Sequence, residues 1–404
     1  MKIKSFKRLI SFSFVNVLAT LMFTLSSIVL FRNIDKEVIG QYSLFIALSG
    51  LIANLSLFGN ATLYSKDVVE LCHRDRLMVL LYLISRYVIF FIFFSIPVFL
   101  FFGWSFIGLL TLIDIGVLKV LRERLFSSYH RIQDSILNYT YVLIIYSLVR
   151  FFITFYFVSN GVSFNVILSS YVILSILSII YLFREIVDVK LQFNLFFKKS
   201  FYTEYISKGS VYFIPSLFIM GFDYVPSLYL AKLKDLSLLA DYAAAQKVTS
   251  IVTILCGIVS QALLPYFRSH VIDEGVAIVK KKVIYILFAS LLMYSVFLGV
   301  VTPFSSQLIA AVYNGQFDSN ASITLVILFF SILFSMVNFI LYPFFQSSGN
   351  ENKIIYSVAP ACIFNIISAF FFINYYGAQG AAISLLISLA ISSAMSFIIL
   401  FRTK

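Results

Sequence analysis

The sequence predicts an all-α polytopic membrane protein, with 12 transmembrane helices in two six-helix lobes and both termini on the cytosolic side. Three observations predict this class. Hydrophobic side chains make up 61% of the 404 residues, only 12% of the residues are charged, and the mean hydropathy is +0.98. One soluble core cannot bury so large an apolar fraction. The apolar residues also form long runs, and the basic residues gather in alternate loops.

Each predicted span is an apolar run that is long enough to cross a bilayer, which takes about 20 residues of helix. The basic start of the chain, Lys2 to Arg8, precedes a run that continues to Phe31 without a small-residue cleavage site, so we expect an uncleaved first helix. The predicted spans are 9–31, 42–60, 77–102, 104–121, 138–158, 163–183, 209–231, 242–264, 282–301, 322–344, 354–374 and 378–401.

The orientation follows from the distribution of lysine and arginine. With the N-terminus inside, 23 of the 30 basic residues fall in inner segments and four in outer segments. Cytosolic loops carry such an excess, so both termini are predicted to lie inside. The net charge of +12 is therefore a topology signal, and we expect no nucleic-acid partner.

Several residues of the first half of the chain have a chemically similar residue 200 positions later, in the second half. Lys232 and Tyr242 lie 200 positions after Arg32 and Tyr42, at matching helix ends. Six spans per half is an even number, so both halves start on the same side and the pseudo-twofold repeat is parallel. The predicted domains are an N-lobe at 1–183, a cytosolic linker at 184–208 and a C-lobe at 209–404.

Five charged residues lie well inside predicted spans, away from the span ends, and are the candidates for function. Arg150 lies about 18 Å along its helix, at ~1.5 Å per residue, so it should face a cavity or pair with a carboxylate such as Asp114. Arg86 is similarly deep, and a structural pair with Asp114 is the alternative to a functional role. Lys247 either faces the same cavity or snorkels to the outer surface. Asp223 is the deepest acid, and it is either a proton or cation site or part of a structural pair.

Several predicted spans carry a polar stripe. On the first span, Asn16, Thr20 and Thr24 recur at helical spacing on one face. The fifth, seventh and tenth spans carry similar stripes. Such stripes either line a water-filled cavity between the lobes or hold helices together by hydrogen bonds.

Short motifs relate the chain to a known family. Phe345–Lys353 (FQSSGNENK) and Tyr376–Ser384 (YGAQGAAIS) resemble the polysaccharide-flippase branch of the multidrug/oligosaccharidyl-lipid/polysaccharide (MOP) exporters. Gly40-Gln41-Tyr42 and Phe58-Gly59 resemble the N-terminal pattern of that branch. The resemblance implies a Wzx-type O-antigen flippase of lipopolysaccharide biosynthesis, with no enzymatic activity and no cofactor. Such a protein moves undecaprenyl-diphosphate-linked oligosaccharide from the inner to the outer leaflet of the bacterial inner (plasma) membrane.

A diphosphate substrate requires fixed positive charge in a polar lumen. We use this requirement to assign a role to each candidate residue. We expect Arg150, Arg86, Lys247 and Asn16 to bind substrate, and Asp223 and Asp114 to couple transport to H+ or Na+. Membrane lipids and other polysaccharide-assembly membrane proteins are the expected partners. The cysteines and histidines show no metal-binding spacing.

Two other classes of protein compete with this interpretation. A MATE-like multidrug or cation antiporter of the same superfamily would carry an acidic excess in the lumen, whereas the buried charges here leave one positive charge in excess. A polyprenyl-linked polysaccharide polymerase or glycosyltransferase would need a large outer loop with catalytic groups, and the predicted outer loops are short.

Overall fold

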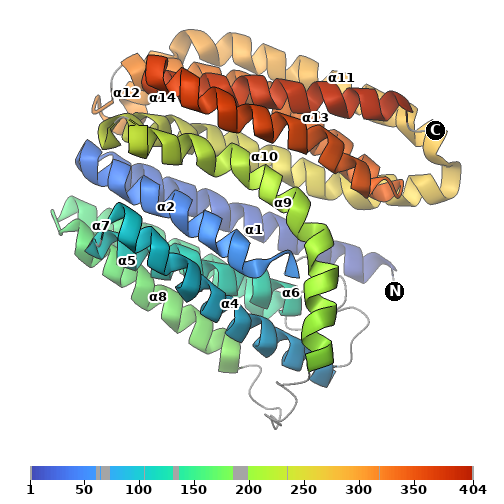
Figure 1. Ribbon diagram of the computed structural model, residues 1–404, viewed down its shortest axis with the longest axis horizontal. Helices are drawn as coiled ribbons and strands as arrows, with labels where there is room; N and C mark the ends of the chain where they lie inside the picture. Colours follow the sequence, from blue (N-terminus) through green and yellow to red (C-terminus); the bar gives the residue numbers. More distant parts are fainter. Residues whose placement is uncertain are drawn as a thin grey trace. The chain divides into compact units, whose positions relative to one another are not determined.

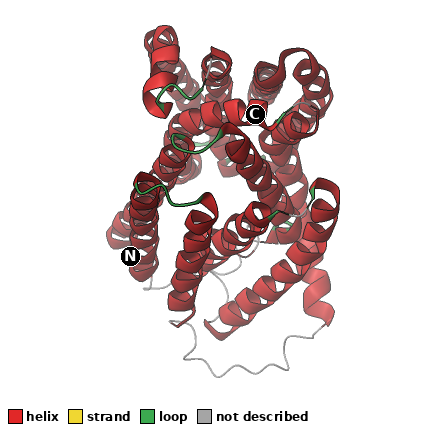
Figure 2. Cartoon of the chain, turned by 90° about the vertical axis from the view of Figure 1, so that its left-hand side faces the viewer, coloured by secondary structure: helices red, strands yellow, loops and turns green. Residues whose placement is uncertain are grey.

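The computed structural model describes residues 2–60, 64, 73–103, 105–130, 136–184, 199–233, 235–317 and 319–402, and every regular element in these ranges is helical (Figure 1). Short loops join the helices (Figure 2). The long α-helices are α1 (Lys2–Phe31), α2 (Lys36–Leu57), α4 (His73–Phe102), α7 (Ile136–Ser159), α8 (Phe164–Arg184), α9 (Lys199–Leu233), α10 (Leu236–Glu274), α11 (Val276–Val301), α13 (Ser319–Ser347) and α14 (Ile354–Arg402). The short elements are α5 (Phe106–Thr111), η1 (Leu112–Leu118), η2 (Leu121–Phe126), α6 (Ser127–His130), η4 (Thr302–Phe304), α12 (Ser305–Tyr313) and η5 (Glu351–Lys353).

Polar residues set the helix ends. Ser105 caps α5, and its hydroxyl accepts a hydrogen bond from the backbone N–H of Gly108 at 3.0 Å. Asp235 caps α10 in the same way through the N–H of Ser237 at 3.2 Å. These side chains satisfy backbone donors that have no partner within the helix. Asn314 ends α12 in the left-handed conformation, with φ 56°.

Nine helices in the described residues are long and apolar enough to cross a membrane, so the chain is a multi-pass membrane protein. Val17–Phe31 is a shorter apolar segment on α1. The number twelve stays a prediction, because some predicted spans do not stand as separate long helices. The predicted span 104–121 is one of these, and it corresponds to α5 followed by η1.

The last long element, α14, covers two predicted spans. Its 49 residues contain one non-helical residue, Gly377, with φ 56°. The Ser384 hydroxyl donates to Asn365 Oδ1 at 2.5 Å and lies 3.1 Å from the Ser368 hydroxyl. In one straight helix Asn365 and Ser384 would be about 28 Å apart, at ~1.5 Å per residue. The chain therefore folds back at Gly377, a conformation that glycine adopts without a Cβ penalty.

The backbone contacts divide the chain into two compact units. The N-terminal unit comprises Met1–Ser26 and Leu44–Met220, and the C-terminal unit comprises Ser27–Ser43 and Gly221–Lys404. Within the N-terminal unit α7 packs against α8, and η1 packs against α8 and α5. Within the C-terminal unit α13 packs against α10, α14 and α11 (Figure 1).

The turn between α1 and α2 is part of the C-terminal unit. Lys36 Nζ lies 3.3 Å from Asp241 Oδ1 on α10, and the Gln316 side-chain amide donates to the carbonyl of Ile34. A Cβ atom on Gly40 would overlap the carbonyl group of Leu236. Glycine at position 40 therefore allows the start of α2 to approach the start of α10 closely.

Candidate functional site

A buried ion pair lies at the centre of the N-terminal unit. Arg150 Nη1 on α7 donates to Asp114 Oδ2 on η1 at 2.8 Å, and both side chains are only 3% exposed. Arg150 Nη1 also donates to the Tyr146 hydroxyl at 2.7 Å. The Ser175 hydroxyl on α8 donates to Asp114 Oδ1 at 2.6 Å and lies 3.0 Å from the Tyr146 hydroxyl. Additional hydrogen bonds of this kind are what a buried ion pair requires to offset its desolvation.

The sequence predicts either a cavity or a carboxylate next to Arg150, and the ion pair shows which of the two is present. For Arg150 the structure shows a carboxylate partner, and the Arg150 guanidinium also stacks on the ring of Tyr171, 3.8 Å from its centroid. Asp114 therefore pairs with Arg150, and the alternative pair with Arg86 is not found among the described residues. The Asp114 carboxylate therefore balances the charge of Arg150 in this conformation.

Arg122 belongs to the same network, although it lies just beyond the end of the predicted span 104–121. It lies on η2, its side chain is 0% exposed, and its guanidinium carbon lies 3.5 Å from the centroid of the Tyr146 ring. Arg122 Nη1 donates to the Ser178 hydroxyl at 3.4 Å, and Nη2 donates to Glu123 Oε1 at 3.3 Å. Arg122 Nε has no acceptor among the described residues. One signal in the sequence was available: Arg122 follows Asp114 at a spacing of two helical turns, on a run that continues the fourth span.

Two π-helices place these charged residues. Asp114 lies in η1 and Arg122 lies in η2, where each backbone N–H reaches one residue further back than in an α-helix. π-helical turns are rare and often occur at functional sites, because they rotate the side chains that follow. Residue patterns based on the 3.6-residue period do not detect this shift.

Arg86 is a half-buried cation, and two of its buried donor atoms have no acceptor among the described residues. On α4, its guanidinium carbon lies 5.8 Å from the ring centroid of Phe58 and 5.4 Å from that of Phe90, within the range of cation–π attraction. Phe58 in turn stacks on Phe213 of α9, with centroids 4.3 Å apart. Arg86 Nε and Nη1 are buried and have no hydrogen-bond partner in the described part of the chain. A buried donor without an acceptor typically costs about 1–3 kcal/mol, so an anion that supplies acceptors would be stabilised there.

Two of the other predicted site residues belong to the C-terminal unit. Asp223 on α9 and Lys247 on α10 belong to the C-terminal unit, whereas Asp114 belongs to the N-terminal unit. The Asp223 side chain is exposed and forms no ion pair among the described residues. Lys247 is half-buried. Asn16 lies on α1, but its side chain is outside the described part of the structure.

Two of the polar stripes hold helices together in this structure. On α7 the Thr154 hydroxyl lies 2.6 Å from the Tyr171 hydroxyl of α8. On α13 the Asn338 side-chain amide donates to the Ser392 hydroxyl of α14 at 3.1 Å, and the Tyr342 hydroxyl lies 3.2 Å from the same oxygen. These stripes therefore form interhelical hydrogen bonds, which was the alternative to a cavity lining.

In the described residues no three His, Cys, Asp or Glu side chains gather as metal ligands would.

Comparisons with known proteins identify the fold. No family model and no curated protein matches the sequence. An inward-facing multidrug resistance MATE family transporter of the MOP superfamily aligns with a TM-score of 0.73 and 11% identity, over 96% of each chain. The lipid II flippase MurJ, in an inward closed conformation, aligns with a TM-score of 0.71 and 14% identity, over 98% of this chain and 88% of that chain.

A third solved structure is a MOP superfamily transporter from Pyrococcus furiosus, described as having a reversed polarity of its binding pocket that suggests a different function. It aligns with a TM-score of 0.59 and 13% identity, over 98% of this chain and 95% of that chain. The three likenesses cover nearly the whole chain at low identity. The chain therefore has the fold of the MOP superfamily transporters.

Proposed function

We propose that this chain is a transporter of the bacterial inner membrane that moves an undecaprenyl-diphosphate-linked oligosaccharide from the inner to the outer leaflet. Alternating access of two lobes would expose the substrate first to one side and then to the other. The fold supports a transporter, and one protein of the same fold is a lipid II flippase. The short motifs that resemble polysaccharide flippases favour an O-antigen or related repeat unit.

The observation that carries this proposal is the environment of Arg86. A diphosphate offers oxygen acceptors, and an arginine fork can donate two hydrogen bonds to them while staying charged at any relevant pH. Arg86 Nε and Nη1 have no acceptor among the described residues, whereas Arg150 is already paired with Asp114. We therefore assign the first phosphate contact to Arg86, with Lys247 and Asn16 as further substrate contacts.

Substitution of Arg86 tests the proposal. Loss of one charge-assisted hydrogen bond of about 1.5–3 kcal/mol should lower substrate engagement roughly ten- to a hundredfold. We expect Arg86→Ala to reduce flipping of lipid-linked oligosaccharide in proteoliposomes by this factor, and Arg86→Lys to retain part of the activity. Arg268→Ala, on the exposed face of α10, is the matched control and should transport normally. Normal flipping by Arg86→Ala, at normal yield, would refute the phosphate contact.

Asp223 supports ion coupling and also favours the second candidate function. A carboxylate that is exposed within a membrane-spanning helix and forms no ion pair among the described residues can take up H+ or Na+. Asp114 is a weaker candidate for coupling, because Arg150 neutralises it. The same acidic residue would suit a MATE-like drug or cation antiporter, the class to which one aligned structure belongs.

The Asp223→Asn variant keeps the shape of the side chain and removes its charge. For an ion-coupled flippase we expect oligosaccharide flipping that no longer responds to an imposed H+ or Na+ gradient. If the wild-type chain instead exports cationic drugs and leaves lipid-linked oligosaccharide unmoved, the antiporter assignment replaces the flippase.

A further inference from the structure

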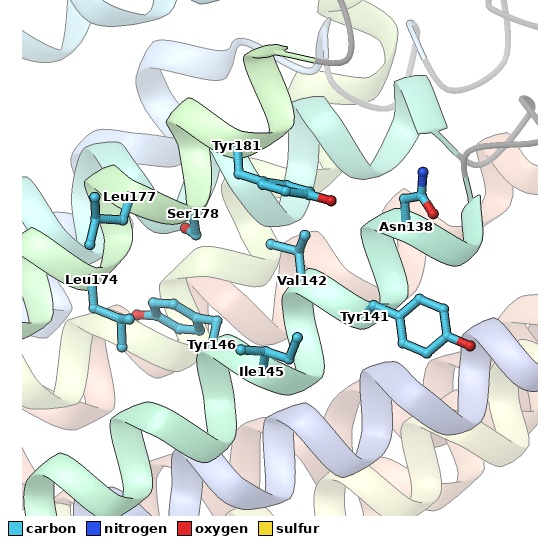
Figure 3. Close-up of a pocket in the computed structure, with 9 residues that line it drawn as sticks. All are labelled: Asn138, Tyr141, Val142, Ile145, Tyr146, Leu174, Leu177, Ser178 and Tyr181. Carbon is cyan, nitrogen blue, oxygen red and sulfur yellow. The ribbon is translucent and has the colours of Figure 1, made fainter.

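An apolar groove runs between α7 and α8 on the N-terminal unit. Its volume is about 320 Å³, at the lower end of the range for ligand pockets, and its walls include Val142, Ile145, Leu174 and Leu177 (Figure 3). Both helices are long and apolar enough to cross a membrane. Ile145 is 59% exposed and Leu177 is 58% exposed. The groove therefore opens on a surface that faces lipid.

Polar groups mark one end of the groove. Asn138 lies in the first turn of α7, and Tyr181 lies in the last turn of α8. Figure 3 shows Asn138 and Tyr141 at the opposite end from Leu174. Arg184 follows Tyr181 by about one turn, is exposed, and forms no ion pair in the described part of the chain. The basic-residue bias predicts that this end lies at the cytosolic surface of the membrane.

A buried positive charge lies directly behind the groove. The Tyr146 ring and the Ser178 hydroxyl line the groove, and both contact the guanidinium of Arg122. Glu123, at 3.3 Å, balances this charge in part, and its side chain is 37% exposed whereas that of Arg122 is 0% exposed. Because a charge acts more strongly through a low-dielectric interior than through water, the buried Arg122 contributes positive potential to the groove.

We propose that this groove binds an anionic phospholipid of the inner leaflet. One acyl chain lies along the apolar walls between α7 and α8. The phosphate head lies at the polar end, where Arg184 supplies charge and Asn138 and Tyr181 supply hydrogen-bond donors. The apolar walls offer few partners for sugar hydroxyls, so the site suits an ordinary phospholipid better than a glycan carrier. The inference is independent of which substrate the chain transports.

Native mass spectrometry of the purified full-length protein tests this site. The probes are dioleoyl phosphatidylglycerol and dioleoyl phosphatidylcholine, which share acyl chains and differ in the charge of the head. We expect wild-type protein to retain phosphatidylglycerol about tenfold more than phosphatidylcholine, as loss of one charge-assisted contact predicts. Arg184→Gln should remove this preference, and Leu174→Trp, which fills the groove, should reduce retention of both lipids.

Matched substitutions elsewhere on the lipid-facing surface are the controls. Leu292→Trp changes a 70% exposed leucine on α11, and Arg402→Gln changes an exposed arginine at the end of α14. Both should retain lipid as the wild type does. Arg184 is exposed at a helix end, so Arg184→Gln tests the site even if Leu174→Trp does not fold. Equal retention of the two lipids by wild type, or an unchanged preference in Arg184→Gln, overturns the proposal. Unchanged retention by a folded Leu174→Trp variant also overturns it.

Discussion

Removal of Asp114 should destabilise the protein strongly, because it leaves the charge of Arg150 buried without its counter-ion. Both side chains are 3% exposed, and the Asp114 carboxylate accepts hydrogen bonds from Arg150 at 2.8 Å and from Ser175 at 2.6 Å. Breaking one side of such a pair costs about 3–5 kcal/mol. We expect Asp114→Ala to lower the free energy of unfolding by this amount, measured by SDS-induced unfolding in mixed micelles.

A double substitution separates the ion pair from simple loss of packing. Asp114→Leu combined with Arg150→Met replaces both charges by apolar groups of similar size, which is often close to neutral. The double variant should therefore be more stable than either single variant, with a coupling free energy of about 2 kcal/mol or more. Arg86→Ala is the matched control, because Arg86 forms no ion pair in the described structure, and this variant should not show the loss of about 3–5 kcal/mol. Additive effects of the two single substitutions would refute this account of the network.

Two further predictions concern stability. Gly40→Ala should be destabilising by about 1–3 kcal/mol, because the added Cβ meets the carbonyl of Leu236, whereas Gly257→Ala, with nothing within 4 Å, should be neutral or stabilising. Thermal melting of both variants tests this contrast, and equal melting points would contradict it. Burial lowers the pKa of His130 from 6.5 to about 4, so the histidine is neutral in the folded protein and the unfolded chain binds the proton first. Stability that is fully present above pH 6.5 should fall as the pH drops towards 4, by at most about 1.4 kcal/mol per pH unit. His130→Gln should remove this part of the pH dependence, and an unchanged profile would show that other groups cause it.

The apolar helices and the break at Gly377 could be predicted from the sequence, because both depend on local chemistry. The predicted spans 42–60 and 242–264 correspond to helices, but the helices begin earlier than predicted, at Lys36 and Leu236, directly after Asp35 and Asp235. Gly377 separates two predicted spans, and the chain folds back there. Depth within a span also identified Arg150 and Arg86 as residues that need a partner or a ligand.

A pair with Asp114 was an alternative for both Arg86 and Arg150, and the sequence could not decide between them, because the choice depends on contacts between distant segments. Asp114 was available in principle to more than one buried base, and only the packing of η1 against α8 and the position of α7 select Arg150. Arg122 was not predicted as a site residue, because the apolar run ends at Leu121. The helical backbone nevertheless continues through η2. The polar stripes were ambiguous for a similar reason. A serine that lines water and a serine that bonds to a neighbouring helix have the same spacing.

The turn between α1 and α2 has a consequence for how the protein is made. Its Ile34 carbonyl accepts a hydrogen bond from Gln316, 282 positions later in the chain. At a synthesis rate of roughly 5–20 residues per second, ~14–56 s pass between the two residues. Lys36 likewise meets Asp241 only after α9 has been synthesised. The first helical hairpin thus waits in the membrane until the second half of the chain arrives. A protein expressed as two fragments could complete this corner only when both fragments share one membrane.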